Sequence, residues 1–103
     1  MPHTLIYWSP EVLTLQRYTT AADMWSLGVT MYQVITGEHP FDTGDEVRFR
    51  EEVMHAKVDY SRLQAHSPRL RMIIENLLKV DMYKRWDANM VLSYAQFDFV
   101  VDI

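Results

Sequence analysis

The sequence predicts an all-α fold of about five helices around one central, buried helix, and two apolar patterns carry this prediction. Over residues 20–36 the apolar side chains fall on nearly every side of a helical wheel, which is typical of a buried helix. Over residues 70–78 they follow the i, i+3, i+4, i+7, i+8 spacing of a helix with one buried face. At 103 residues the chain is expected to form one domain, residues 1–103.

Capping and turn residues set the predicted limits of the first elements. Residues 1–9 show no period and are expected to be extended or irregular. Ser9, followed by a proline, is the predicted cap of a short helix. Thr20, with an acid three residues later, is the predicted cap of the central helix, and Gly37 is its predicted stop.

The same signals place the later elements. A charged, amphipathic helix is predicted over residues 45–56, and residues 57–66 are expected to form a loop. Ser67 precedes a proline at the start of the helix with the clean apolar stripe, and Asp87 is the predicted cap of a last helix. This last helix is expected to direct three apolar side chains inward: Val91, Leu92 and Ala95. The tail over residues 97–103 alternates like a short strand, although an extended end is the preferred expectation.

Composition argues against several classes of partner and cofactor. The formal net charge is −4, without a block of basic residues, so neither nucleic acid nor an anionic membrane is an expected partner. There is no cysteine, and therefore neither a disulfide framework nor a thiolate metal site. No apolar run approaches the ~18 residues of a membrane-spanning helix, and the first residues do not resemble a signal peptide. We expect an intracellular, cytoplasmic protein.

A search for catalytic patterns finds none. The three glycines have no spacing that forms a phosphate-binding loop. Four histidines lack the i, i+4 spacing of a zinc site, and we expect them at or near the surface: His3, His39, His55 and His66. The charge run over residues 48–52 fits a solvated helix face or, as the sharper alternative, a surface that docks a partner. The residues by themselves therefore predict neither a catalytic nor a metal site.

Three charged residues adjoin apolar sequence. Asp23 lies where the central helix becomes wholly apolar, and a buried carboxylate must find hydrogen-bond donors. One capping bond does not fill the acceptor capacity of a carboxylate, so Asp23 is expected to be buried and to hold backbone N–H groups. Glu11 and Arg85 also stand beside apolar residues, and each is a suitable partner for the other.

Four motifs follow one another along the chain. Residues 4–11 read TLIYWSPE, residues 23–29 read DMWSLGV, residues 37–41 read GEHPF and residues 77–85 read LLKVDMYKR. Their order and spacing resemble the C-terminal half of the large lobe of a eukaryotic protein kinase, over roughly residues 3–97. The patterns matched are T-x-x-Y-x-A/S-P-E at the end of the activation segment, D-x-W-S-x-G-V, G-x-x-P-F and L-L-x-x-D-P-x-x-R. The T-x-x-Y form implies a Ser/Thr-directed kinase.

The resemblance implies roles for the matched residues. Three would lie in the loop that receives the substrate residue after the phosphorylated one: Thr4, Leu5 and Ile6. Seven would be structural: Tyr7, Pro10, Glu11, Asp23, Trp25, Gly28 and Arg85. Among these, Glu11 and Arg85 would form the family's buried ion pair, Asp23 would hold the backbone of the catalytic loop, and Trp25 would pack under the activation segment.

The resemblance also implies what this chain does not supply. His3 replaces the family's usual glycine and Met82 the usual proline, but neither change contradicts the fold. Phosphoryl transfer needs a loop over the phosphates, a lysine that pairs with them, and acids that hold Mg²⁺. In kinases these groups precede the matched segment, so we expect ATP and Mg²⁺ to bind the parent kinase and neither to bind this chain. The chain alone is expected not to be an enzyme.

Two interpretations remain besides the fragment of a Ser/Thr kinase. A stand-alone, pseudokinase-like interaction module would bind protein substrates or regulators, or the remainder of a kinase domain, through the helix over residues 45–56 and bare apolar faces. An unrelated all-helical domain would match the motifs by chance. In the fragment, the central helix would lack its usual cover, and we expect marginal stability or self-association through five apolar side chains: Met24, Trp25, Met31, Tyr32 and Val34.

Overall fold

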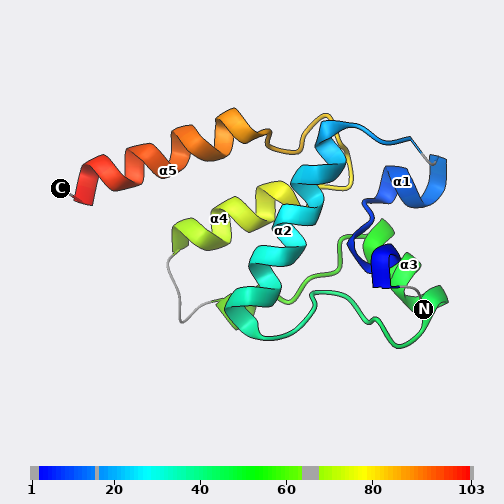
Figure 1. The fold of residues 1–103 in the computed structure, drawn as a ribbon. Helices are drawn as coiled ribbons and strands as arrows, with labels where there is room; N and C mark the ends of the chain where they lie inside the picture. Colours follow the sequence, from blue (N-terminus) through cyan, green and yellow to red (C-terminus); the bar gives the residue numbers. More distant parts are fainter. Residues whose placement is uncertain (1–2, 16, 64–67, 103) are drawn as a thin grey trace.

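The computed structural model describes residues 3–15, 17–63 and 68–102, and these residues form helices joined by loops (Figure 1). The elements in chain order are the 3₁₀ helix η1 (His3–Tyr7), α1 (Pro10–Leu15), α2 (Thr20–Thr36), α3 (Glu46–Met54), the 3₁₀ helix η2 (Tyr60–Leu63), α4 (Pro68–Leu77) and α5 (Ala88–Asp102). The described residues contain no strand, so the all-α prediction is confirmed over this part of the chain.

Helix α2 runs through the middle of the molecule and packs chiefly against α4, while α1, α3 and η1 lie at its other side (Figure 1). Gly28 permits the close approach of α2 and α4. A Cβ atom on Gly28 would stand 2.8 Å from Leu77 Cβ and 3.0 Å from Leu78 Cδ2. Both distances are shorter than normal carbon–carbon contacts, so a glycine is needed where the two helices meet.

The core forms where the inward side of α2 meets its neighbours. Trp25, Val29 and Tyr32 of α2 are almost wholly buried, and they pack with apolar residues of α3 and α4. Phe49 and Val53 of the amphipathic helix α3 are both fully buried. The apolar stripe predicted for α4 is likewise buried, with Leu70 only half-buried: Ile73, Ile74, Leu77 and Leu78.

Helix α2 is central but is not covered on all sides, as expected for a chain that lacks part of the usual cover. Val34 is 78% exposed and Leu27 is 40% exposed, whereas Met24 and Met31 are half-buried. The expected bare apolar face therefore exists, but two residues predicted for it, Trp25 and Tyr32, are buried instead. The helical wheel shows which side chains are apolar, but it does not show which of them other elements cover.

The N-terminal cap of α2 differs from its prediction, whereas the C-terminal stop agrees with it. Thr19, and not Thr20, is the N-cap, because its Oγ1 accepts a hydrogen bond from the backbone N–H of Ala21 at 3.2 Å. Gly37 ends the helix in the left-handed region at φ 79°, and its backbone N–H donates to the carbonyl of Gln33 at 2.8 Å. Glycine adopts this conformation without the strain that a Cβ brings.

Helix α5 differs most from its prediction. Asp87 caps it as expected, since Asp87 Oδ1 accepts from the backbone N–H of Met90 at 2.9 Å. The helix continues to Asp102, so the strand or extended tail predicted for residues 97–103 is wrong over its described part. Of the three side chains expected to face inward, Val91 is half-buried, and Leu92 and Ala95 are exposed.

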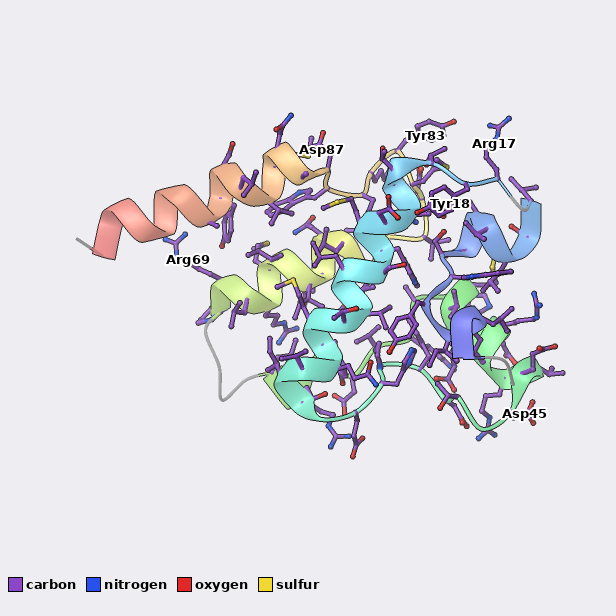
Figure 2. All side chains as sticks on the ribbon, in the orientation of Figure 1. Arg17, Tyr18, Asp45, Arg69, Tyr83 and Asp87 are labelled. Atoms are coloured by element: carbon purple, nitrogen blue, oxygen red, sulfur yellow. The ribbon has the colours of Figure 1, made fainter. Side chains whose placement is uncertain are left out.

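Those side chains are exposed because α5 projects away from the other helices (Figure 1). Figure 2 shows Arg69 reaching from the start of α4 toward α5, where its guanidinium lies 5.4 Å from the centre of the Tyr94 ring. The projection gives the chain a radius of gyration of 13.8 Å, above the ~13 Å typical of a compact domain of this length. The described helices include none that is long and apolar enough to span a membrane.

The remaining boundaries differ in detail. The segment expected to be irregular forms η1 over residues 3–7, and the predicted loop over 57–66 contains η2. Helix α3 is shorter than residues 45–56, with Asp45 as its N-cap through bonds from the N–H groups of Val47 and Arg48. The proposed cap Ser67 lies outside the described residues.

Candidate functional site

A buried ion pair joins the start of α1 to the loop after α4. Arg85 Nη1 donates to Glu11 Oε2 at 2.8 Å and Arg85 Nη2 donates to Glu11 Oε1 at 3.0 Å, a bidentate arrangement. The side chain of Arg85 is 0% exposed and that of Glu11 is 6% exposed. Paired, parallel hydrogen bonds of this kind are among the strongest polar contacts in proteins.

Arg85 has further partners that account for its burial. Its Nε and Nη2 donate to the carbonyl of Lys79 at 3.0 and 2.8 Å, and its Nη1 donates to the carbonyl of Ala21 at 2.8 Å. These bonds connect the first turn of α2, the loop that follows α4, and α1. A single guanidinium therefore ties α1 and the first turn of α2 to the loop that follows α4.

The ring of Trp25 packs against the buried ion pair. The guanidinium carbon of Arg85 lies 5.2 Å from the centre of the Trp25 ring, and this ring stacks on Phe41 at 5.7 Å with an interplanar angle of 2°. Trp25 is fully buried, and its Nε1 has no hydrogen-bond partner among the described residues. At this distance the guanidinium and the Trp25 ring make a cation–π contact.

The ion pair determines the charge of Glu11. Burial by itself raises the pKa of Glu11, but the hydrogen bonds and the positive charge of Arg85 outweigh burial and hold the pKa below the ordinary value of 4.5. Glu11 is therefore ionised near neutral pH. A carboxylate whose pKa is lowered on folding stabilises the folded state above pH 4.5, and this contribution is lost as the pH falls through the folded pKa.

The segment matched to the substrate-binding loop lies in η1 and is held by three hydrogen bonds. Ser26 Oγ of α2 donates to the carbonyl of Tyr7 at 2.7 Å, and Tyr7 Oη donates to Gln33 Oε1 at 2.9 Å. His39 Nε2 lies 2.8 Å from the carbonyl oxygen of Ile6. Leu5 is buried and Ile6 is half-buried, whereas nothing is described of the Thr4 side chain.

Asp23 does not lie where the sequence suggested. It is exposed in the first turn of α2 and accepts a hydrogen bond from Tyr18 Oη, whose pKa this bond raises (Figure 2 labels Tyr18). Successive residues turn ~100° around a helix, so Asp23 and Trp25, two residues apart, point in nearly opposite directions. The expected burial of Asp23 is therefore wrong in this chain, and no backbone N–H of the described residues donates to it.

Metal binding has no candidate among the described residues, since no three acidic or histidine side chains gather at one place. His55 is exposed, as expected for a surface histidine.

His39 is the residue of this site that sequence reasoning missed. It makes hydrogen bonds through both ring nitrogens. Its position inside the motif over residues 37–41 was the available signal.

Comparison with known proteins places the chain in a family. The model of the protein kinase domain family matches residues 1–97, so the chain belongs to this family. The serine/threonine-protein kinase ATG1 of Beauveria bassiana is 33% identical over 94 residues, which are 89% of this chain and 10% of that protein. The human 3-phosphoinositide-dependent protein kinase 1 is 34% identical over 92 residues, 89% of this chain and 16% of that protein.

Solved structures agree with these relatives. The crystal structure of Rad53 1-466 in complex with AMP-PNP superposes with a TM-score of 0.79 at 29% identity, over 88% of this chain and 25% of that chain. Titin kinase and its flanking domains give a TM-score of 0.76 at 28% identity, over 89% of this chain and 17% of that one. The chain therefore has the all-helical fold of part of a kinase domain and spans a quarter or less of each of these proteins.

Proposed function

We propose that residues 1–103 form the part of a Ser/Thr protein kinase domain that runs from the end of the activation segment to the last helix of the large lobe. The parent activity is ATP-dependent phosphorylation of proteins. The observation that carries this proposal is the bidentate Glu11–Arg85 pair, because it anchors the segment just after Thr4–Ile6 to the helical body. Such a substrate-binding segment needs a rigid support to orient a peptide.

In this proposal Thr4, Leu5 and Ile6 contact the substrate residue that follows the phosphorylated one. The support for this role is mechanical: the carbonyls of Ile6 and Tyr7 are each held by a side chain from the central part of the fold. ATP and Mg²⁺ are bound by the remainder of the parent domain, since the groups that hold them in kinases do not occur in this sequence. Asp23 binds the backbone of the catalytic loop there, and its exposure here is compatible with a partner from outside this chain.

The direct test has two arms. The transcript upstream of Met1 is read for the catalytic-loop and Asp-Phe-Gly motifs, and the longer protein is assayed for transfer of phosphate from ATP to Ser/Thr peptides. We expect both motifs, transfer by the longer protein, and none by the 103-residue chain alone. Transfer by the chain alone, or an upstream frame without kinase motifs, would contradict the proposal.

The alternative function is a stand-alone interaction module, and the exposed side of α2 is the observation that favours it. Leu27 and Val34 are solvent-exposed apolar residues, and α3 adds an outward face with Val47 at 77% exposure beside charged residues. In this alternative α3 docks protein regulators, or the apolar face of α2 binds the remainder of a kinase domain. A stop codon upstream without kinase sequence, together with a stable protein complex lost in Val34→Lys, would favour the module over the kinase fragment.

A further inference from the structure

His39 links two loops through both nitrogens of its ring. Nε2 lies 2.8 Å from the carbonyl oxygen of Ile6, and the backbone N–H of Phe41 donates to Nδ1 at 3.1 Å. A ring nitrogen that accepts a hydrogen bond carries no proton, and a nitrogen facing a carbonyl needs one. Nδ1 also lies 3.2 Å from the Phe41 carbonyl oxygen, but the neutral ring with its proton on Nε2 satisfies both the Ile6 carbonyl and the Phe41 N–H.

The surroundings of the ring disfavour a positive charge. Tyr7 meets the ring edge-on at 5.9 Å, and Phe41 and Phe49 lie at 6.0 Å on tilted planes. The Tyr7 phenol, the titratable group among these neighbours, already donates to Gln33. Burial lowers the pKa of His39 below 6.5, and this effect exceeds the opposite effect of the carbonyls of Ile6 and Phe41.

The carboxylates that flank His39 along the chain are engaged elsewhere. Glu38 pairs with Arg62 from η2, and Asp42 pairs with Arg48 of α3 at 3.6 Å. Among the described residues, no carboxylate contact with the His39 ring offsets a charge on it. The ring is held by backbone groups and aromatic faces.

We propose that His39 is a proton-sensitive positioning residue that holds the substrate-binding segment in η1 while its ring is neutral and loosens this segment when the ring is protonated. The proposal rests on the function proposed above and adds a regulation of the same site. The step is the transfer of one proton from water to Nδ1. The new N–H then has the Phe41 carbonyl oxygen at 3.2 Å as its acceptor, but the N–H of Phe41 loses its own acceptor and a charge enters the aromatic surroundings.

The direction of the pH dependence follows from linkage. A histidine whose pKa is lowered on folding stabilises the folded arrangement fully above its unfolded value of 6.5. This contribution decreases as the pH falls from 6.5 through the folded pKa. Acidification below pH 6.5 is therefore expected to loosen η1.

The test is nuclear magnetic resonance on the full ¹⁵N-labelled chain. The ring nitrogen shifts of His39 report its tautomer and pKa, and the amide of Trp8, which donates to the carbonyl of Leu5 at 3.0 Å, reports the state of η1. We expect the Nε2–H tautomer, a pKa below 6.5, and a Trp8 amide shift with the same midpoint. His39→Gln keeps a donor for Ile6 without titrating and removes that midpoint, whereas the exposed control His55→Gln leaves it unchanged.

A second readout is hydrogen exchange of the Trp8 amide in His39→Leu, which removes the donor. Protection at neutral pH is expected to fall roughly three- to tenfold, the change that one net hydrogen bond gives. A His39 pKa at or above 6.5 in the wild-type chain, or a Trp8 amide indifferent to it, would overturn the proposal even if the variants failed to fold. These readouts are independent of phosphate transfer, so a parent protein without kinase activity would overturn the proposed function alone.

Discussion

At the scale of the residue, Arg85 is the buried charged side chain that holds several parts of the fold together. It pairs with Glu11 through two hydrogen bonds, binds backbone carbonyls of two other segments, and covers the face of Trp25. A buried ion pair is not a large net source of stability, because desolvation offsets its attraction. Its loss on one side is costly, since it leaves the other charge buried and unpaired.

Replacing Arg85 by alanine is therefore expected to lower the free energy of unfolding by about 3–5 kcal/mol. Arg85→Lys is expected to be destabilising as well, because lysine lacks the planar fork that meets both oxygens of Glu11. Urea denaturation measures both. The control is Arg62→Ala, which breaks an ion pair with Glu38 whose side chains are 43% and 59% exposed and is expected to cost ~0–1 kcal/mol. Equal losses in Arg85→Ala and the control would contradict this account.

Glu11 gives the matching pH dependence. Its folded pKa lies below 4.5, so its contribution to stability is complete above pH 4.5 and disappears as the pH falls through the folded pKa. The difference in unfolding free energy between the wild type and Glu11→Gln is expected to be constant from pH 7 to about pH 5 and to shrink at lower pH. A difference that grows on acidification would show that the pKa is raised instead.

At the scale of the element, the crossing of α2 and α4 depends on the absence of a side chain. Gly28→Ala places a Cβ 2.8 Å from Leu77 Cβ, which is bonded directly to the backbone of α4 and cannot rotate away. The helices must separate, so we expect a loss of about 1–3 kcal/mol, measured by thermal unfolding. Gly44→Ala, in a loop where the nearest atom is Asp42 Oδ1 at 3.3 Å, is expected to change stability by less than ~0.5 kcal/mol. A Gly28→Ala variant as stable as the wild type would contradict the close crossing.

The elements also show how far the sequence predicts the structure. The stripe of α4 and the Asp87 cap depend on local spacing, and both predictions are confirmed. Sequence spacing cannot tell how much of a helix its neighbours cover, and for that reason the predicted inward face of α5 was wrong and Trp25 and Tyr32 were wrongly placed on the bare face of α2. Asp23 failed similarly, because its burial was inferred from apolar neighbours in the sequence that point in other directions.

The candidate site was partly predictable. The contact of Glu11 with Arg85 was predicted from the motif resemblance. Local spacing could not have predicted it, because 74 residues separate the two. His39 was missed because a lone histidine has no periodic signature. Its role depends on the carbonyl of Ile6, which is 33 residues away along the chain.

At the scale of the whole molecule, the uncovered side of α2 is the feature that stands out. Val34 is 78% exposed, and Leu27 lies on the same helix with 40% exposure. In the proposed parent domain this side is covered by other parts of the large lobe. In the isolated chain it is free to associate with a second copy.

We expect the isolated chain to self-associate, and sedimentation velocity measures this as a mass that rises with concentration. Val34→Lys is expected to shift the chain toward the monomer without loss of stability, because the lysine stays in water. Val47→Lys is the matched control, since Val47 is 77% exposed and belongs to α3 and not to α2. A wild-type chain that stays a compact monomer at every concentration would contradict this expectation.

The central claim is that Glu11 and Arg85 act as one unit that fastens the segment proposed to bind substrate to the helical body. A double-mutant cycle with Glu11→Gln and Arg85→Lys, measured by urea denaturation at pH 7, tests it most directly. The account predicts a coupling energy of ~1–3 kcal/mol between the two positions. Additive losses, with a coupling energy near zero, would contradict it.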